Sequence, residues 1–155
     1  MEGLARRVSR AGGIGGFGRA KNGAAPRQAY HREAMQRFML RSKIHGARVT
    51  EADLNYMGSV TIDRDLLEAV DIVPNEKVLV VNLENGTRVE SYAFEGEPGS
   101  GIIGVNGGMA RHAQVGDRIL IMTFAAVNEE ELRTHKPKVI FTDEKNRIES
   151  ALETV

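Results

Sequence analysis

The 155-residue chain has no cysteine, which excludes disulfides, thiol nucleophiles and cysteine-bound metals. It also has no apolar run that approaches the roughly 18 residues of a membrane-spanning helix. Its histidines show neither HxxxH nor HExxH spacing, so the sequence predicts no metal site; they are His31, His45, His112 and His135. From these absences we expect a soluble, cytoplasmic protein with no metal and no membrane partner.

The chain has no net charge, because 21 Lys/Arg balance 21 Asp/Glu, but the two signs are unevenly distributed. Residues 1–38 carry eight Lys/Arg against two Glu, a balance of +6, and residues 39–155 carry thirteen against nineteen, a balance of −6. Residues 1–34 are also rich in glycine and lack apolar periodicity, so we expect a disordered N-terminal extension. Its arginines leave open a transit peptide or a nucleic-acid-binding arm.

Apolar residues make up 41% of the chain, enough for one hydrophobic core, and the sequence after residue 38 mostly predicts short strands. The stretch MLRSKIHGARVT favours a strand that Gly46 interrupts. TEAD (50–53) resembles a capping box and predicts one helical turn. Residues 56–62, YMGSVTI, favour extended structure on both sides of the pair Gly58-Ser59.

A short helix and a hairpin are predicted next. Asp63 can cap the helix RDLLEAV, whose apolar side consists of Leu66, Leu67 and Val70. The stretch EKVLVVNLENGTRVESYAFEG predicts two strands around Asn85-Gly86, the pair typical of a type I′ turn. On the second of these strands, side chains two residues apart share one face; they are Arg88, Glu90 and Tyr92.

The last predicted elements are two more strands and a helical turn. SGIIGVNGGMA favours a strand that runs into a glycine turn, and VGDRILIMTFAAV a strand that follows a Gly-Asp turn. NEEEL predicts a final helical turn, and the charged C-terminus after it is expected to be peripheral. Many short strands with glycine turns predict a mainly β fold, a compact β-barrel with short helical insertions.

Isolated motifs say little about function. GGIGGFG (12–18) has no strand before it, which makes it poor evidence for a phosphate-binding loop, and the chain has no GxSxG sequence. A pair such as Gly58-Ser59 is usually a turn. The alternative is that the peptide bond within this pair is itself a substrate.

Several blocks in order resolve that question by resemblance. MLRSKIHGARVTEADLNYMGSVTID, NGTRVESYAF, GSGIIGVNGGMARHAQVGD and ILIMTF resemble the pyruvoyl-dependent aspartate 1-decarboxylase family, over residues 35 to about 142. The resemblance implies a double-psi β-barrel domain at 35–142, between the extension 1–34 and a charged tail at 143–155. It also implies a homotetramer with sites between subunits, and leaves open whether a maturation factor assists the chain.

The resemblance implies that the chain cleaves itself between Gly58 and Ser59. Ser59 then becomes a pyruvoyl group, which holds the substrate as a Schiff base; neither a metal nor pyridoxal phosphate is implied. The glycine lacks Cβ and leaves its carbonyl open to attack. The hydroxyl of Ser91 is the expected donor to the oxyanion, at a position where family members commonly have threonine.

For the substrate, L-aspartate, the resemblance implies two cations and one acid. Arg88 can bind a carboxylate bidentately, Lys43 adds a point charge, and Tyr92 is the expected proton donor. A substrate-binding turn is implied at Gly107, Gly108 and Met109, where smaller residues than methionine are frequent. Ser91 also lies in the implied substrate site, and supporting roles are assigned to His45 and Asn106.

Two functions follow from these observations. The first is a self-processing decarboxylase that converts L-aspartate to β-alanine and carbon dioxide for pantothenate and coenzyme A synthesis. The second is a non-catalytic β-barrel module that binds nucleic acid or another acidic partner through its basic N-terminal arm. The acidic balance of residues 39–155 argues against a nucleic-acid surface on the folded domain, so we expect no nucleic-acid partner.

Overall fold

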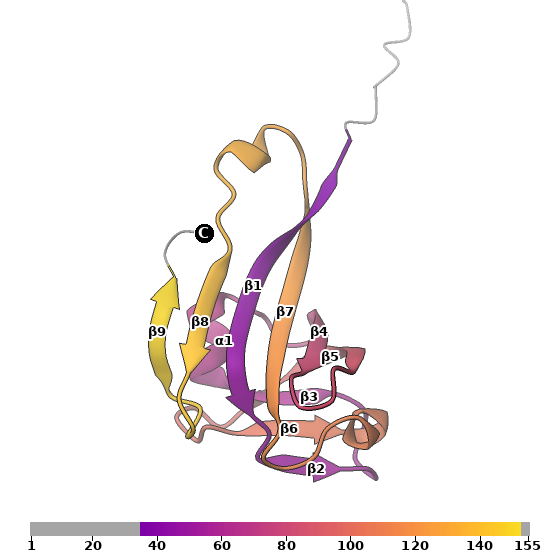
Figure 1. Ribbon diagram of the computed structural model, residues 1–155. Coiled ribbons are helices and arrows are strands. Elements are labelled where there is room, and N and C mark those ends of the chain that lie inside the picture. The colour runs from indigo at the N-terminus through magenta and orange to yellow at the C-terminus, as the bar shows by residue number, and fades with distance from the viewer. Residues whose placement is uncertain (1–34, 153–155) are drawn as a thin grey trace, which may run out of the picture. The chain divides into compact units, whose positions relative to one another are not determined.

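Nine strands form one mixed sheet in the computed structural model, which describes residues 35–152 (Figure 1). The predicted disordered extension, 1–34, lies outside the described residues. The strands are β1 (Arg37–Arg48), β2 (Glu51–Asp53), β3 (Val60–Asp63), β4 (Lys77–Asn82), β5 (Arg88–Gly96), β6 (Ile103–Asn106), β7 (Arg118–Val127), β8 (Lys138–Thr142) and β9 (Ile148–Leu152). The helices are α1 (Arg64–Val70) and two 3₁₀ helices, η1 (Gly107–Arg111) and η2 (Glu131–Arg133).

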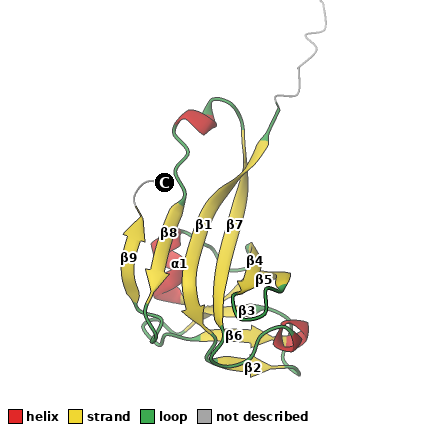
Figure 2. Ribbon diagram, viewed as in Figure 1, coloured by secondary structure: helices red, strands yellow, loops and turns green. Residues whose placement is uncertain are grey.

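The sheet order is β2-β6-β3-β5-β4-β7-β1-β8-β9. Three neighbouring pairs are parallel, β1 with β8, β2 with β6 and β3 with β5, and the other pairs are antiparallel. The sheet bends strongly, so that β2, β3 and β6 run across the lower ends of the long strands β1 and β7 (Figure 1). Helices are few and short (Figure 2). The predicted mainly β, barrel-like fold with helical insertions is confirmed.

The core lies inside this bend. Inward-pointing residues of five strands are fully buried; they include Ile44, Val60, Ile62, Val78, Val80, Ile103, Val105, Ile119 and Ile121. The predicted helix is confirmed, with Asp63 accepting a hydrogen bond from the Asp65 amide at 2.9 Å. The residues of its predicted apolar side, Leu66, Leu67 and Val70, are buried as expected.

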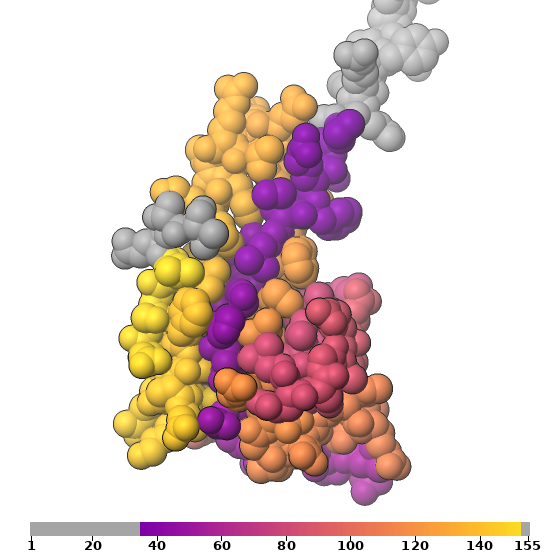
Figure 3. All heavy atoms as spheres, viewed as in Figure 1, coloured from indigo at the N-terminus to yellow at the C-terminus, as the bar shows by residue number. Residues whose placement is uncertain are grey.

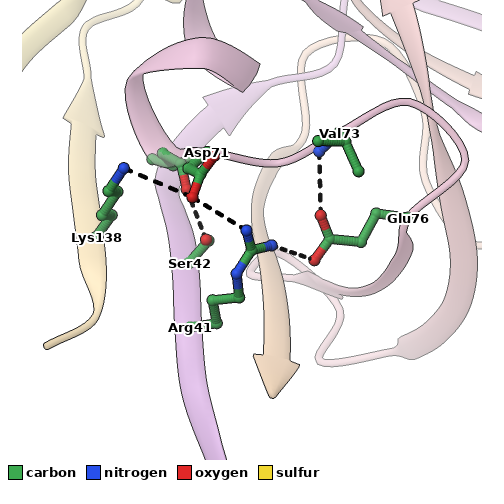
Figure 4. Close-up of polar contacts among 7 residues, drawn as sticks. Arg41, Ser42, Asp71, Val73, Glu76 and Lys138 are labelled. Carbon is green, nitrogen blue, oxygen red and sulfur yellow. Dashed lines mark hydrogen bonds and ion pairs between the residues drawn. The ribbon is translucent and has the colours of Figure 1, made fainter. Parts of the chain in front are cut away.

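The end of α1 is attached to β1 by polar contacts (Figure 4). Ser42 donates a hydrogen bond to the Val70 carbonyl at 2.6 Å. Arg41, at a bulge in β1, reaches Glu76 at 2.7 Å and Asp71 at 3.0 Å. The hydrogen bond and the charge of Glu76 raise the pKa of Arg41. These contacts hold the helix against the strand that carries Lys43.

Two local predictions after β1 are wrong. Glu51–Asp53 forms strand β2 instead of a helical turn, because the Thr50 hydroxyl binds the backbone of Ile103 and does not cap a helix. The strand expected at 56–62 begins only at Val60 and ends at Asp63. The residues before it form an exposed turn, and Ser59 is the first buried residue. Gly46 lies at a bulge inside β1 and does not end the strand.

The hairpin of β4 and β5 is confirmed, but its type I′ turn is wrong. Such a turn needs positive φ at both central residues, and of the pair only Gly86 has it, at 74°. The connection is instead a longer loop, in which the Gly86 amide donates to the Asn82 carbonyl at 2.9 Å. The Asn85 side chain also donates to the His112 carbonyl at 3.0 Å, a tertiary contact that competes with the tight turn.

The C-terminal part contributes more than the expected periphery. β8 pairs in parallel with β1, and its Val139 and Ile140 are buried. After it, Asn146 adopts a left-handed conformation and is buried. Its amide accepts from the Arg48 N–H at 2.7 Å and donates to the Gly101 carbonyl at 2.7 Å. This part of the chain therefore anchors the end of β1.

Candidate functional site

The bond between Gly58 and Ser59 lies where an exposed turn enters the core. Gly58 is exposed, and no atom outside its neighbours lies within 4 Å of the position where a Cβ would be. Ser59 is only 1% exposed and comes directly before β3. The Gly58 carbonyl therefore belongs to an exposed residue without a side chain, and the next residue, Ser59, is buried.

Asn106, at the end of β6, holds Ser59 with its backbone and its side chain. The Asn106 N–H donates to the Ser59 carbonyl at 3.0 Å, and Nδ2 donates to Ser59 Oγ at 3.0 Å. The same Nδ2 also donates to Thr61 Oγ1 at 3.1 Å. The Ser59 hydroxyl has one further, long contact, to the Met57 carbonyl at 3.4 Å. The predicted supporting residue Asn106 therefore contacts Ser59 directly.

The predicted glycine turn begins the 3₁₀ helix η1, and its first residue packs on the Gly58 backbone. Gly107 has a φ of 59°, and a Cβ there would lie 2.9 Å from Gly58 Cα. Gly108 is exposed with open space around it. The Met109 side chain is 4% exposed and belongs to the core, so it does not fill the space next to Gly108.

The strand register places Tyr92 beside Ser59. β3 and β5 are parallel with Val60 opposite Ala93, so the register continued by one residue sets Ser59 level with Tyr92. Ala93 and Val60 are fully buried, whereas Tyr92 is 38% exposed on the other face of its strand. The same register sets Ser91 level with Gly58, on the inward face. Among the described residues, no hydrogen bond joins the Ser91 hydroxyl to either residue of the Gly-Ser pair.

Arg88 and Tyr92 share the outer face of β5, as predicted. Arg88 donates to the Gly86 carbonyl at 3.0 Å, and no carboxylate within residues 35–152 pairs with it. Its guanidinium therefore keeps donors for an anion.

Lys43 and His45 lie elsewhere in the chain, on β1. In the sheet order, β7 and β4 separate β1 from β5, which puts Lys43 on the order of 14 Å along the sheet from β5. The His45 ring packs on Phe141, with centroids 4.8 Å apart, and its Nδ1 is buried without a hydrogen-bond partner in the described region. Burial, and then the charge of Lys43, lower the pKa of His45. Within residues 35–152, no hydrogen bond joins Lys43 or His45 to Ser59.

Thr61 is the contact that the sequence analysis missed. It lies two residues after Ser59 on β3, so the period-two alternation of a strand places both hydroxyls on one face. That alternation was the available signal. It could not show that one amide on another strand binds both.

The surface hollows that we describe do not include Ser59. Four of them, of about 300 to 400 Å³, occur on the described part, and none of the four is lined by Ser59. One is a groove whose lining combines apolar side chains with an ion pair; its residues are Phe38, Leu79, Met122, Phe124, Lys77 and Glu90. Residues 35–152 contain no group of three or more acidic or histidine side chains placed to hold a metal. They also contain no helix long and apolar enough to cross a membrane.

Comparison with known proteins shows the family of this chain. The family model described as aspartate decarboxylase matches residues 35–149. A protein of Listeria monocytogenes serovar 1/2a, named aspartate 1-decarboxylase, is 57% identical over 118 residues, 76% of this chain and 93% of the relative. Proteins of the same name from Thermoanaerobacter pseudethanolicus and Bacillus licheniformis are 58% identical over 113 residues and 54% over 118. These matches cover 73% and 76% of this chain, and 97% and 93% of the relatives. The chain belongs to the aspartate decarboxylase family.

Proposed function

We propose that this protein is a self-processing aspartate 1-decarboxylase, a lyase that converts L-aspartate to β-alanine and carbon dioxide for pantothenate and coenzyme A synthesis. One observation carries the proposal. The chain belongs to the aspartate decarboxylase family, and its Gly58-Ser59 pair is held on both sides. Asn106 donates to the Ser59 hydroxyl at 3.0 Å, and Gly107 packs on the Gly58 backbone. A binding module acting through its N-terminal arm would need neither contact, and the comparisons do not favour it.

The proposed cleavage starts from the Ser59 hydroxyl. Its Oγ bonds to the Gly58 carbonyl carbon, the C–N bond breaks, and the hydroxyl proton ends on the freed nitrogen, which leaves an ester. Loss of the Ser59 Cα proton then breaks the Cβ–Oγ bond, so Gly58 leaves as a carboxylate and position 59 becomes dehydroalanine. Addition of water releases ammonia and leaves a ketone. Ser91, level with Gly58 in the strand register, is the proposed donor to the oxyanion.

The residues around position 59 fit a pyruvoyl group. Such a group supplies an electron-withdrawing ketone that binds an amino group covalently and accepts electrons as a carboxylate leaves. The Asn106 N–H donates to the Ser59 carbonyl oxygen, which processing leaves in place, and the site is buried on one side and open at Gly58. Neither a metal nor pyridoxal phosphate is part of the proposal.

The outer face of β5 supplies the proposed substrate contacts. Arg88 binds a carboxylate of L-aspartate through its free donors. Tyr92, level with Ser59, delivers a proton from its hydroxyl to the carbon that has lost carbon dioxide. Gly107, Gly108 and the Met109 backbone line the approach, because the exposed Gly108 leaves room for a ligand.

A second copy of the chain completes the proposed site. Lys43 and His45 lie on β1, and a strip of β7 separates β1 from the β4–β5 hairpin (Figure 3). Because two strands separate β1 from β5, we assign Lys43 to the Ser59 site of another subunit. We therefore include a homo-oligomer, expected as a tetramer, in the proposal.

Purified protein tests this function directly. Incubation with L-aspartate should yield β-alanine and carbon dioxide, and denaturing electrophoresis should show two pieces cut at Gly58-Ser59. The Ser59→Ala variant should stay whole and inactive, because alanine has no nucleophilic oxygen. Uncleaved wild-type protein that retards nucleic acid would support the binding module instead.

A further inference from the structure

We propose that Thr61 is a positioning residue for chain cleavage: it accepts one N–H of the Asn106 amide and so directs the other at Ser59 Oγ. The inference rests on the proposed self-processing and names a residue that acts on Ser59 through Asn106. Its basis is the pair of hydrogen bonds from one Nδ2, 3.0 Å to Ser59 and 3.1 Å to Thr61.

The geometry of β3 and β6 explains why one amide reaches both hydroxyls. The strands are antiparallel with Thr61 opposite Gly104, and the register continued by two residues sets Ser59 opposite Asn106. Asn106 therefore meets Ser59 directly and Thr61 along the diagonal, a distance that a side chain can span. The two hydrogens of a planar amide point in fixed directions, so fixing one direction fixes the other.

Gly104 keeps Thr61 in place for this contact. A Cβ on Gly104 would lie 3.2 Å from Thr61 Cβ and 3.5 Å from its Oγ1. The threonine side chain thus occupies space that any larger residue at 104 would contest. A separate feature of the sheet, the missing side chain opposite Thr61, therefore supports the position of its hydroxyl.

Loss of the Thr61 hydroxyl should change the orientation of the Asn106 side-chain amide. Asn106 is only 7% exposed, so an N–H without its acceptor favours rotation of the amide toward solvent. That rotation withdraws the donor from Ser59 Oγ. A small misplacement of a reacting group can cost a large factor in rate, so cleavage should slow although Ser59 itself is unchanged.

The test follows precursor cleavage in the full-length chain after a short pulse of cell-free synthesis, by denaturing electrophoresis. Thr61→Val keeps the side-chain shape and should slow cleavage by roughly tenfold or more. Thr61→Ser restores the hydroxyl and should recover the rate to within about twofold. Thr123→Val is the matched control, because Thr123 is a buried strand threonine whose Oγ1 has no partner in the described region. Its cleavage should match wild type.

Each outcome has one reading. Wild-type cleavage with equally fast Thr61→Val cleavage overturns the inference and leaves the proposed function standing. Equal slowing in the Val and Ser variants also overturns it, since the hydroxyl would then not matter. A wild-type chain that never cleaves refutes the proposed function itself. Thermal unfolding of Thr61→Val in a Ser59→Ala background should keep one cooperative transition above the temperature of the cleavage assay, which separates positioning from a folding defect.

Discussion

Gly107→Ala should destabilise the fold and slow cleavage, because two separate costs meet at this position. A left-handed φ of 59° costs a residue with a Cβ about 1–2 kcal/mol. The new Cβ would also lie 2.9 Å from Gly58 Cα and 3.2 Å from the Tyr56 carbonyl oxygen, both backbone atoms, so the turn itself must move. Together these costs should lower the free energy of unfolding by at least about 2 kcal/mol.

The assay is thermal unfolding at one protein concentration, in a Ser59→Ala background that keeps every chain whole. For a domain of this size, a loss of 2 kcal/mol corresponds to a fall in Tm of roughly 8 °C. Gly108→Ala is the matched control, because its φ is not positive and no atom lies within 4 Å of its added Cβ. Equal Tm values for the two variants would refute the reasoning from close approach.

Three further predictions concern substrate and protons. Tyr92→Phe should still cleave at Gly58-Ser59 and bind L-aspartate in a borohydride-trappable adduct, but release β-alanine about 10²–10⁴-fold more slowly; wild-type release would remove Tyr92 from the mechanism. Arg88→Ala should cleave normally and raise the KM for L-aspartate, and Arg88→Lys should recover only part of it; an unchanged KM would contradict the anion contact. The lowered pKa of His45 means that the unfolded chain takes up its proton more readily, so stability should fall as the pH drops below about 6.5. His45→Phe should lessen that fall between pH 7 and 5 in urea unfolding, and parallel curves would contradict it.

Capping and turn residues predicted the correct structure where no contact from a distant part of the chain competes with them. The α1 helix follows from Asp63 as a cap and from three apolar residues on one side, and both features are observed. The helical turn predicted from the capping box at Thr50 is wrong, because the Thr50 hydroxyl accepts a hydrogen bond from the Ile103 N–H on β6. That strand lies some fifty residues away in sequence, so no local pattern indicates the contact. The pair Asn85-Gly86 predicted a hairpin correctly but not its turn, since Asn85 binds the His112 carbonyl.

The candidate site shows the same limit. Arg88 and Tyr92 share a face because of period-two alternation, which a sequence displays. The contact of Asn106 with Ser59 depends on the pairing of β3 with β6, and only the resemblance pointed to these residues together. Nothing in the pattern indicated that Gly107 packs on Gly58, or that Thr61 shares the Asn106 amide. Strand β8 was not predicted, because it forms by parallel pairing with β1, which is far away in the sequence.

Intact-mass spectrometry of the purified wild-type protein tests the central claim most directly. Self-processing predicts two chains that part between Gly58 and Ser59, with the C-terminal chain lighter by one ammonia than the same chain beginning with serine. Ser59→Ala should give a single uncut mass. A wild-type C-terminal chain that begins with an unaltered serine would mean ordinary hydrolysis, and a single uncut wild-type chain would mean no processing; either result would contradict the account.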